Sequence, residues 1–155
     1  MKIGLGSDHA GFELKEDIKV YLQEEFPEHE LVDMGAYETT STSYAIYGAK
    51  VGHAVAAGEL DRGIVICGSG LGISMTAGKI RGVRAALCHD EYTARMSRLH
   101  NDANILAMGG RVIGKGLARE MVRVWLEQDF EGGRHQNRVD QIESLTQEDH
   151  SMPEK

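Results

Sequence analysis

Residues 63–73 read Gly-Ile-Val-Ile-Cys-Gly-Ser-Gly-Leu-Gly-Ile. The first five residues lack polar alternation, as is typical of a strand that is covered on both faces of a parallel sheet. A glycine-rich turn follows at 68–72, and residues 71–79 then continue as a short helix. A buried strand that leads directly into a helix is the repeating unit of α/β proteins. This stretch therefore predicts an α/β fold.

The same alternation of short apolar runs and longer amphipathic stretches continues on both sides. It predicts strands at 2–6, 30–34, 63–67, 83–88 and 105–108, and helices at 12–26, 44–57, 71–79, 91–99 and 115–128. In the last of these helices, Leu117, Met121, Val124 and Trp125 are expected to face the core. The pattern predicts one three-layer α/β/α domain with a five-stranded parallel sheet. We expect this domain to span 1–145, with a C-terminal helix near 136–145 and a polar tail at 146–155.

Composition excludes several classes of protein. The chain has 155 residues, enough for one domain, and 17 basic against 24 acidic side chains give a net charge of -7. That charge argues against a nucleic-acid partner. No apolar run reaches the ~20 residues of a membrane span, and the N-terminus does not resemble a signal peptide. Two cysteines make no disulfide framework. We expect a cytoplasmic protein.

Polar residues gather where the predicted strands end. Asp8 and His9 follow the first strand, His89 and Asp90 follow the fourth, and Arg111 follows the fifth. Ligands of parallel α/β sheets bind outside the carboxyl ends of the strands. We therefore expect these side chains to surround the loop after the third strand.

That loop carries both a thiol and free backbone amides. Amides at a helix N-terminus bind anions, and such a position favours the thiolate form of a cysteine. No Asp, Glu or Lys occurs between Cys67 and Gly78, so proton chemistry here would fall to Cys67. Ile73 breaks the dinucleotide fingerprint and no Walker lysine is present. The alternatives are a tight packing turn and a cysteine that merely packs, as we expect of Cys88.

Two further features bear on function. His100 and Asn101 close the fourth helix, where a histidine could instead only satisfy the helix dipole. Arg134 and Arg138 lie four residues apart after two glycines and suit an anionic group such as phosphate. The alternative is a solvated helix whose arginines pair with acidic neighbours, Glu131 and Asp140.

We expect no metal site. The histidines that could ligate a metal lack His-x-x-x-His spacing; they are His9, His89, His100 and His135.

Four segments together resemble the ribose-5-phosphate isomerase type B family, which includes allose- and galactose-6-phosphate isomerases. They are Gly-Ser-Asp-His-Ala-Gly-Phe-Glu-Leu-Lys at 6–15, Ile-Cys-Gly-Ser-Gly-Leu-Gly-Ile at 66–73, Arg-Leu-His-Asn-Asp-Ala-Asn at 98–104 and Glu-Gly-Gly-Arg-His-Gln-Asn-Arg-Val at 131–139. The resemblance runs from residue 2 to about 142. It implies a Rossmann-like domain with strand order 2-1-3-5-4, and isomerisation without a cofactor.

The resemblance also implies residue roles. Cys67 matches the base that moves a proton between C1 and C2 of the open sugar through a cis-enediolate. Ser69 and the amides of the loop glycines, Gly68, Gly70 and Gly72, match the group that steadies the enediolate oxygen. His100 matches the residue that opens the furanose ring, with Asp8 opposite it.

Substrate binding is implied for a further set, namely Asn101 at the hydroxyls, Tyr44 at the pocket wall, and His9, Arg111, Arg134 and Arg138 at the phosphate. Part of the phosphate grip would come from a second subunit, in a homodimer or a dimer of dimers.

Two departures bear on which sugar is bound. The family usually has Asp-Tyr-Pro where this chain has Ser43-Tyr44-Ala45, and commonly has Asn where this chain has Gly78. Ribose 5-phosphate and ribulose 5-phosphate are the expected substrates. Allose or galactose 6-phosphate, or a tetrulose 4-phosphate, is the first alternative. A non-catalytic nucleotide-binding module that uses the 68–72 loop is the alternative from another class.

Overall fold

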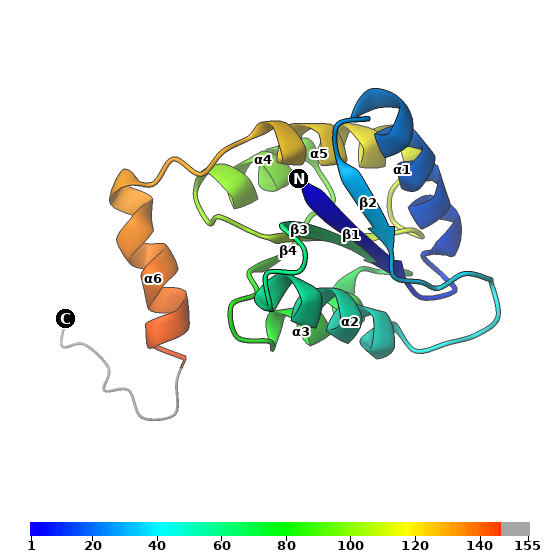
Figure 1. Ribbon diagram of the computed structural model, residues 1–155, viewed down its shortest axis with the longest axis horizontal. Helices are drawn as coiled ribbons and strands as arrows, with labels where there is room; N and C mark the ends of the chain where they lie inside the picture. Colours follow the sequence, from blue (N-terminus) through cyan, green and yellow to red (C-terminus); the bar gives the residue numbers. More distant parts are fainter. Residues whose placement is uncertain (147–155) are drawn as a thin grey trace.

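A five-stranded parallel sheet forms the centre of the computed structural model, which describes residues 1–146 (Figure 1). Its strands are β1 (Lys2–Ser7), β2 (Glu30–Asp33), β3 (Arg62–Cys67), β4 (Ala85–Leu87) and β5 (Ile105–Gly109). They lie in the order β2-β1-β3-β5-β4, which confirms the predicted sheet and strand order. The fourth strand is shorter than predicted because Val83 belongs to a turn, in which its amide donates to the carbonyl of Ile80.

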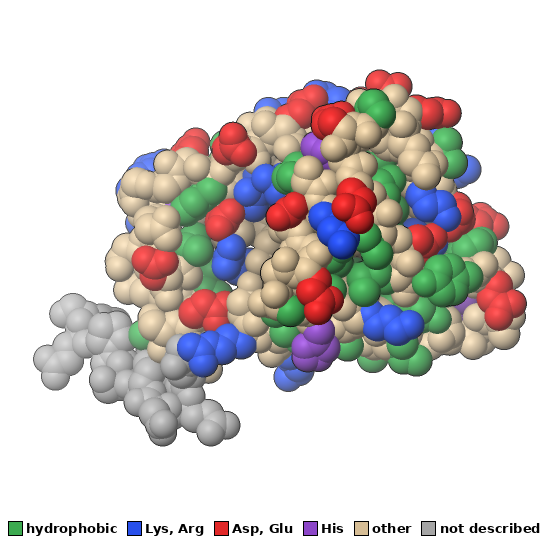
Figure 2. Space-filling view, viewed as in Figure 1, with side chains coloured by type: hydrophobic (Ala, Val, Ile, Leu, Met, Phe, Trp, Pro, Cys, Tyr) green, Lys and Arg blue, Asp and Glu red, His purple; other side chains and the backbone are tan. Residues whose placement is uncertain are grey.

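Helices cover both faces of the sheet, which confirms the three layers (Figure 1). One face carries α2 (Tyr44–Ala56) and α3 (Leu71–Gly78); the other carries α1 (Phe12–Glu25), α4 (Glu91–Leu99) and α5 (Lys115–Glu127). Among residues 1–146, no helix has the length and apolar character that a membrane crossing requires. Figure 2 shows acidic and basic side chains interspersed over the described part of the face in view.

Alternate side chains of β3 serve the two layers. Ile64 and Ile66 belong to the core beneath α1 and α5, whereas Val65 and Cys67 belong to the core beneath α2 and α3. All four are buried, which explains why this strand lacks polar alternation. Because Cys67 is the last residue of the strand, its thiol stands at the carboxyl edge of the sheet.

The inward face of α5 is largely as predicted. Met121, Val124 and Trp125 are buried, but the prediction was wrong for Leu117, which is 38% exposed. The buried position in that first turn belongs to Ala118 instead.

An arginine closes the end of α5. The Arg62 guanidinium lies over the Trp125 ring, 5.3 Å from its centroid, and donates to the carbonyls of Trp125 and Leu126. Burial, together with the nearby charge of Arg98, lowers the pKa of Arg62 to about 10. Carbonyls that the helix leaves unpaired thus gain a buried donor.

A buried ion-pair network fixes the end of β2 against α1. Lys15 is fully buried, and its Nζ donates to both carboxylate oxygens of Asp33 at 2.8 Å and to Glu16 at 2.6 Å. Asp33 also accepts from the amide of Gly35 at 3.0 Å. Burial raises the pKa of Asp33, but the hydrogen bonds from Lys15 and Lys19 outweigh burial and leave that pKa lowered.

A pair of glycines separates the last helix from the sheet. Gly132 and Gly133 have φ angles of 63° and 51°, a region that side-chain-bearing residues rarely adopt. The short turn η1 (Gly133–His135) follows, then α6 (Gln136–Ser144), which stands at the left of Figure 1 beside the domain. The helix predicted at 136–145 is therefore present. The expected tail at 146–155 lies outside the described residues except for its first residue.

Candidate active site

A pocket of about 350 Å³ opens at the carboxyl edge of the sheet, around the end of β3. Most of the residues that the sequence marked as substrate-binding or catalytic line it, namely Asp8, His9, Tyr44, Cys67, Gly68, Ser69, Gly72 and Arg111. Three loops supply these residues, one after each of β1, β3 and β5, and α2 supplies Tyr44. The adjacent order of these three strands brings the loops together.

The thiol of Cys67 is held by its own loop. The Gly70 amide donates to Sγ at 3.1 Å, and the side chain is 3% exposed. Gly70 is the N-cap of α3 and has a φ of 78°. A Cβ at that position would lie 2.5 Å from Leu87 Cδ1 and 2.8 Å from the carbonyl carbon of Met108. Glycine is therefore needed here to aim an amide at the sulfur.

Cys88 has a different environment. It is also 3% exposed, but it belongs to the core beneath α1, α4 and α5. Burial raises the pKa of the Cys88 thiol, which favours its neutral form. This environment agrees with the packing role expected for Cys88.

The carboxylate of Asp8 is oriented by the start of α1. Its Oδ1 accepts from the amides of Ala10 at 2.9 Å and Gly11 at 3.0 Å, and the residue is 5% exposed. Both bonds fall on one oxygen. The carboxylate therefore keeps a second oxygen for a ligand in the pocket.

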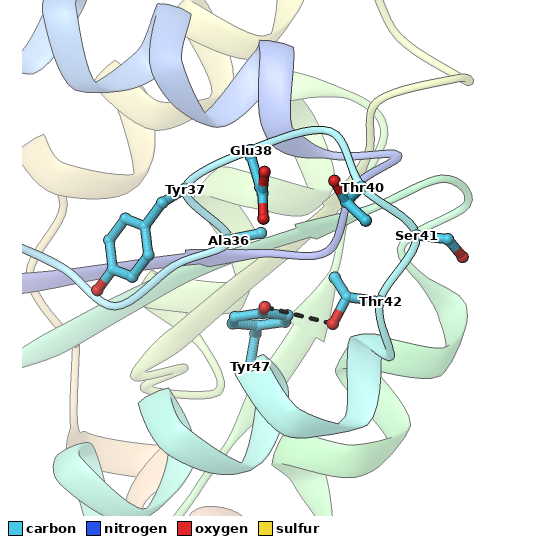
Figure 3. A pocket seen from close by; sticks show the side chains of 7 residues that line it. All are labelled: Ala36, Tyr37, Glu38, Thr40, Ser41, Thr42 and Tyr47. Atoms are coloured by element: carbon cyan, nitrogen blue, oxygen red, sulfur yellow. Dashed lines mark hydrogen bonds between the residues drawn. The ribbon is translucent and has the colours of Figure 1, made fainter.

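His9 is fixed by the loop between β2 and α2. Its Nδ1 lies 3.1 Å from the amide nitrogen of Thr42 and 3.2 Å from the Thr42 carbonyl oxygen. Thr42 Oγ1 lies in turn 3.3 Å from the hydroxyl of Tyr47, as Figure 3 shows. This loop borders a second, polar pocket of about 430 Å³. No sequence motif pointed to Thr42, because its main contact uses the backbone.

Arg111 joins the Cys67 pocket to a neighbouring one. Its amide donates to the carbonyl of Gly68 at 3.0 Å, so the arginine is tied to the Cys67 loop. The neighbouring pocket, of about 520 Å³, shares His9 and Arg111 and adds Lys115. Within residues 1–146 the Arg111 side chain makes no ion pair, so its charge is available to an anion.

His100, Arg134 and Arg138 form no part of the Cys67 pocket. The ring of His100 stacks on His135, with centroids 4.2 Å apart and planes 15° apart. Glu131 Oε2 lies 3.3 Å from His135 Nε2 and 4.0 Å from His100 Nε2. Arg134 Nε donates to His135 Nε2 at 3.3 Å. Neither arginine forms an ion pair within residues 1–146, so the solvated, paired helix that was the alternative is not observed.

The Cys67 pocket and the cluster around His100 lie at opposite ends of the sheet. His100 and Asn101 precede β5, whereas Cys67 is level with the end of β5, paired with Gly109. Four residue steps along β5 correspond to about 13 Å. In Figure 1 the group with α6 is at the left, and the loop between β2 and α2 is at the right. One chain therefore does not bring its own His100 to its own Cys67.

The potential ligand atoms of His100, Glu131 and His135 lie within 4.8 Å of one another. Sequence spacing missed this group because His135 reaches His100 from a distant segment. A metal bound by two imidazoles must lie near both ring planes, since the nitrogen lone pairs are in-plane. Two stacked rings with planes only 15° apart do not meet that condition.

Comparison with known proteins identifies the family. Residues 3–142 match the model described as Ribose/Galactose Isomerase. The chain belongs to this family. It is 47% identical to ribose-5-phosphate isomerase B of Escherichia coli over 94% of this chain and 97% of that relative. The structure of Clostridium thermocellum ribose-5-phosphate isomerase B matches with a TM-score of 0.91 and 52% identity, covering 94% of this chain and 97% of that one.

Family members differ in the sugar that they are named for. D-Erythrulose-4-phosphate isomerase of Pectobacterium atrosepticum is 38% identical over 92% of this chain and 93% of its own length. Membership thus makes the chain a sugar-phosphate isomerase and disfavours the nucleotide-binding module.

The two departures from the usual family sequence, at Ser43-Tyr44-Ala45 and at Gly78, lie in different parts of the structure. Ser43 caps α2 by accepting from the Ala45 amide beside the Cys67 pocket, whereas Gly78 lines a pocket with Asn101 and Ile142.

Proposed function

We propose that this enzyme interconverts D-ribose 5-phosphate and D-ribulose 5-phosphate, with Cys67 as the base. The observation that carries this proposal is the Gly70 amide that donates to the Cys67 sulfur, in the wall of a pocket that Asp8 and Arg111 also line. A hydrogen bond from a backbone amide stabilises a thiolate more than a thiol. The loop contains no competing acid or base from Cys67 to Gly78.

The reaction then moves two protons in total, one from C2 to C1 through Cys67 and one from the C2 oxygen to the C1 oxygen. The thiolate takes the proton from C2 of the open aldose, the C2–H electron pair forms the C1–C2 double bond, and the carbonyl oxygen becomes the enediolate oxygen. The proton of the C2 hydroxyl moves to the C1 oxygen, and Cys67 returns its proton to C1. Ser69 and the amides of Gly68 and Gly72 would donate to the enediolate oxygen, where negative charge develops, while the Gly70 amide stays on the Cys67 sulfur.

We propose further that each site is shared between two copies of the chain. His100, Asn101, Arg134 and Arg138 would enter the Cys67 pocket of a partner and bring ring-opening and phosphate-binding groups. Their position at the opposite end of the sheet supports this arrangement. His9 and Arg111 would complete the phosphate grip from the first chain, and bidentate arginine contacts suit a phosphate.

Exposed apolar side chains around the pocket favour such an assembly. Tyr44 and Val112 line the pocket and are 45% and 56% exposed, and Leu71 and Met75 of the adjoining α3 are 51% and 65% exposed. Large exposed apolar patches usually mark interfaces. We therefore propose a homodimer, or a dimer of dimers.

The proposed mechanism uses no metal or cofactor, because Cys67, His100, the loop amides and the arginines supply each group that aldose–ketose isomerisation needs. Treatment with a chelator should leave turnover unchanged. A cytoplasmic location, where Cys67 would stay reduced, remains a prediction.

The deciding experiment measures turnover on four-, five- and six-carbon sugar phosphates. Ribose 5-phosphate should give the highest kcat/KM. Cys67→Ala should abolish exchange of the C2 proton with solvent while it leaves phosphate binding nearly intact. Cys67→Ser should also be poor, because a serine hydroxyl is a much weaker acid. Cys88→Ala is the matched control and should retain turnover; wild-type exchange in Cys67→Ala would refute the assignment.

A four-carbon substrate is the second candidate, because a relative of 38% identity is a D-erythrulose-4-phosphate isomerase. A higher kcat/KM on a tetrose 4-phosphate than on ribose 5-phosphate would replace the first proposal with this one. The proton chemistry at Cys67 would be the same.

A further inference from the structure

Glu131 is the acidic group nearest to His100 among the contacts of the described chain. Its Oε2 lies 4.0 Å from His100 Nε2, and its backbone amide donates to the carbonyl of Leu99 at 3.0 Å. That backbone bond ties Glu131 to the last turn of α4, immediately before His100. From the sequence, Glu131 was expected only as a possible partner of an arginine, but within residues 1–146 its side-chain partners are His100 and His135.

His135 supports the same imidazole from the other side. It is 6% exposed and stacks on His100 at 4.2 Å. Burial lowers the pKa of His135, and the nearby charges of His100, Arg134 and Arg138 lower it further against the opposing effect of Glu131. A neutral His135 accepts from Arg134 at Nε2 and so offers no proton there to the carboxylate. Glu131 therefore remains available to His100.

We propose that Glu131 is a positioning residue for ring opening, holding the imidazole of His100 in place while His135 provides a stacking platform. This inference rests on the proposed function and deepens it. A carboxylate 4.0 Å from the ring favours one orientation of the imidazole through electrostatic attraction. His100 is about one-third exposed and would otherwise have several orientations.

The distance of 4.0 Å between Glu131 Oε2 and His100 Nε2 is too long for a hydrogen bond, so Nε2 is free to donate to the sugar. His100 Nε2 gives its proton to the ring oxygen of the furanose as the bond between C1 and that oxygen breaks. The anomeric hydroxyl becomes the C1 carbonyl and passes its proton to the Asp8 carboxylate of the chain that supplies Cys67. No group other than the sugar is changed after the two protons are returned through solvent.

The test compares two reactions of the full-length Glu131→Gln variant, which keeps the size of the side chain and removes its charge. The first is pre-steady-state ring opening of cyclic ribose 5-phosphate. The second is exchange of carbon-bound hydrogen in ribulose 5-phosphate, a ketose that cannot close a furanose ring. Ring opening should slow by about tenfold, a part of the roughly 10²–10⁴-fold that acid–base assistance supplies as a whole, and exchange should be unchanged. Glu131→Asp, which keeps the charge, should recover part of the rate.

Three further variants separate charge from packing. His135→Phe keeps a stacking ring and should open the sugar nearly as fast as wild type, whereas His135→Ala should be slower. Asp140→Asn removes an acidic charge from α6 at a residue bonded to Gln136, and it should change neither reaction. Wild-type ring opening in Glu131→Gln, or an equal fall in both reactions, would overturn the inference. A wild-type enzyme that isomerises no sugar phosphate would instead refute the proposed function, before any variant is compared.

Discussion

The Gly70 amide donates to the Cys67 sulfur over 3.1 Å, across the turn that ends β3 and begins α3. The bond requires Gly70 to adopt a φ of 78°. The strand's register and the backbone conformation of one glycine thus fix the environment of the proposed base.

Gly70→Ala should therefore lower both stability and turnover. A left-handed residue with a side chain costs about 1–2 kcal/mol, and the Cβ would also clash with Leu87 and Met108. We expect a loss of about 2 kcal/mol or more in thermal or denaturant unfolding. Gly116→Ala is the control, because a Cβ there meets nothing within 4 Å and the helical backbone suits alanine. Equal stability of the two variants would contradict this account.

His100→Ala should slow ring opening of the aldose more than proton exchange in the ketose. The equilibrium constant fixes the ratio of overall efficiencies, so pre-steady-state ring opening must be followed directly. His53→Ala, on the exposed side of α2, is the control. Unchanged ring opening in His100→Ala would leave His100 as no more than the residue that ends α4.

Mixing Cys67→Ala chains with Arg138→Ala chains should restore activity. Each variant alone should be nearly inactive, but a mixed dimer would combine the intact Cys67 of one chain with the intact Arg138 of the other. Random pairing in a twofold dimer restores about a quarter of the wild-type sites. Activity is measured after subunit exchange, and mixed dimers are counted by mass. Mixed dimers without activity would show that Arg138 serves its own subunit.

Asp33→Asn should destabilise the fold by about 3 kcal/mol at neutral pH, because it leaves the buried Lys15 with fewer partners. The Asp33 pKa is lowered in the folded state, so its contribution is present above the unfolded value of about 3.9 and is lost as pH falls below it. The wild-type melting temperature should fall faster than that of Asp33→Asn below about pH 4. Glu30→Gln, which removes an exposed pair with Lys2, should cost less than about 1 kcal/mol.

The sequence predicted the elements well because short apolar strands alternate with helices along the chain. The central strands β1, β3 and β5 are almost wholly buried, whereas the edge strands β2 and β4 are partly exposed. The apolar run through Ile64, Val65 and Ile66 and the turn at Gly68–Gly72 were enough to place the proposed base at the sheet's carboxyl edge. The edge residues Asp8, His9 and Arg111 followed from the same rule. Leu117 was misplaced because helical periodicity does not tell which residue of the first turn meets the sheet.

The position of His100 could not be predicted in the same way. The resemblance of residues 98–104 to the family implies that His100 is a site residue, but only the three-dimensional fold shows that it lies at the opposite end of β5 from Cys67. Its contacts with Glu131 and His135 join segments about thirty residues apart in sequence, so no local pattern revealed them. The backbone bonds of Thr42 to His9 were hidden for a related reason, because any residue could supply them.

The two glycines before α6 set where Arg134 and Arg138 stand relative to their own domain. In the shared site that we propose, Arg111 lies in the same chain as Cys67. The distance from the Cys67 sulfur to the guanidinium groups of Arg134 and Arg138 depends instead on the contact between subunits and on the backbone at Gly132 and Gly133. Sugar phosphates with four, five or six carbons differ mainly in that distance. Insertions or deletions next to Gly132 and Gly133 would therefore change the length of sugar phosphate that the site accepts, without a change to any reacting residue.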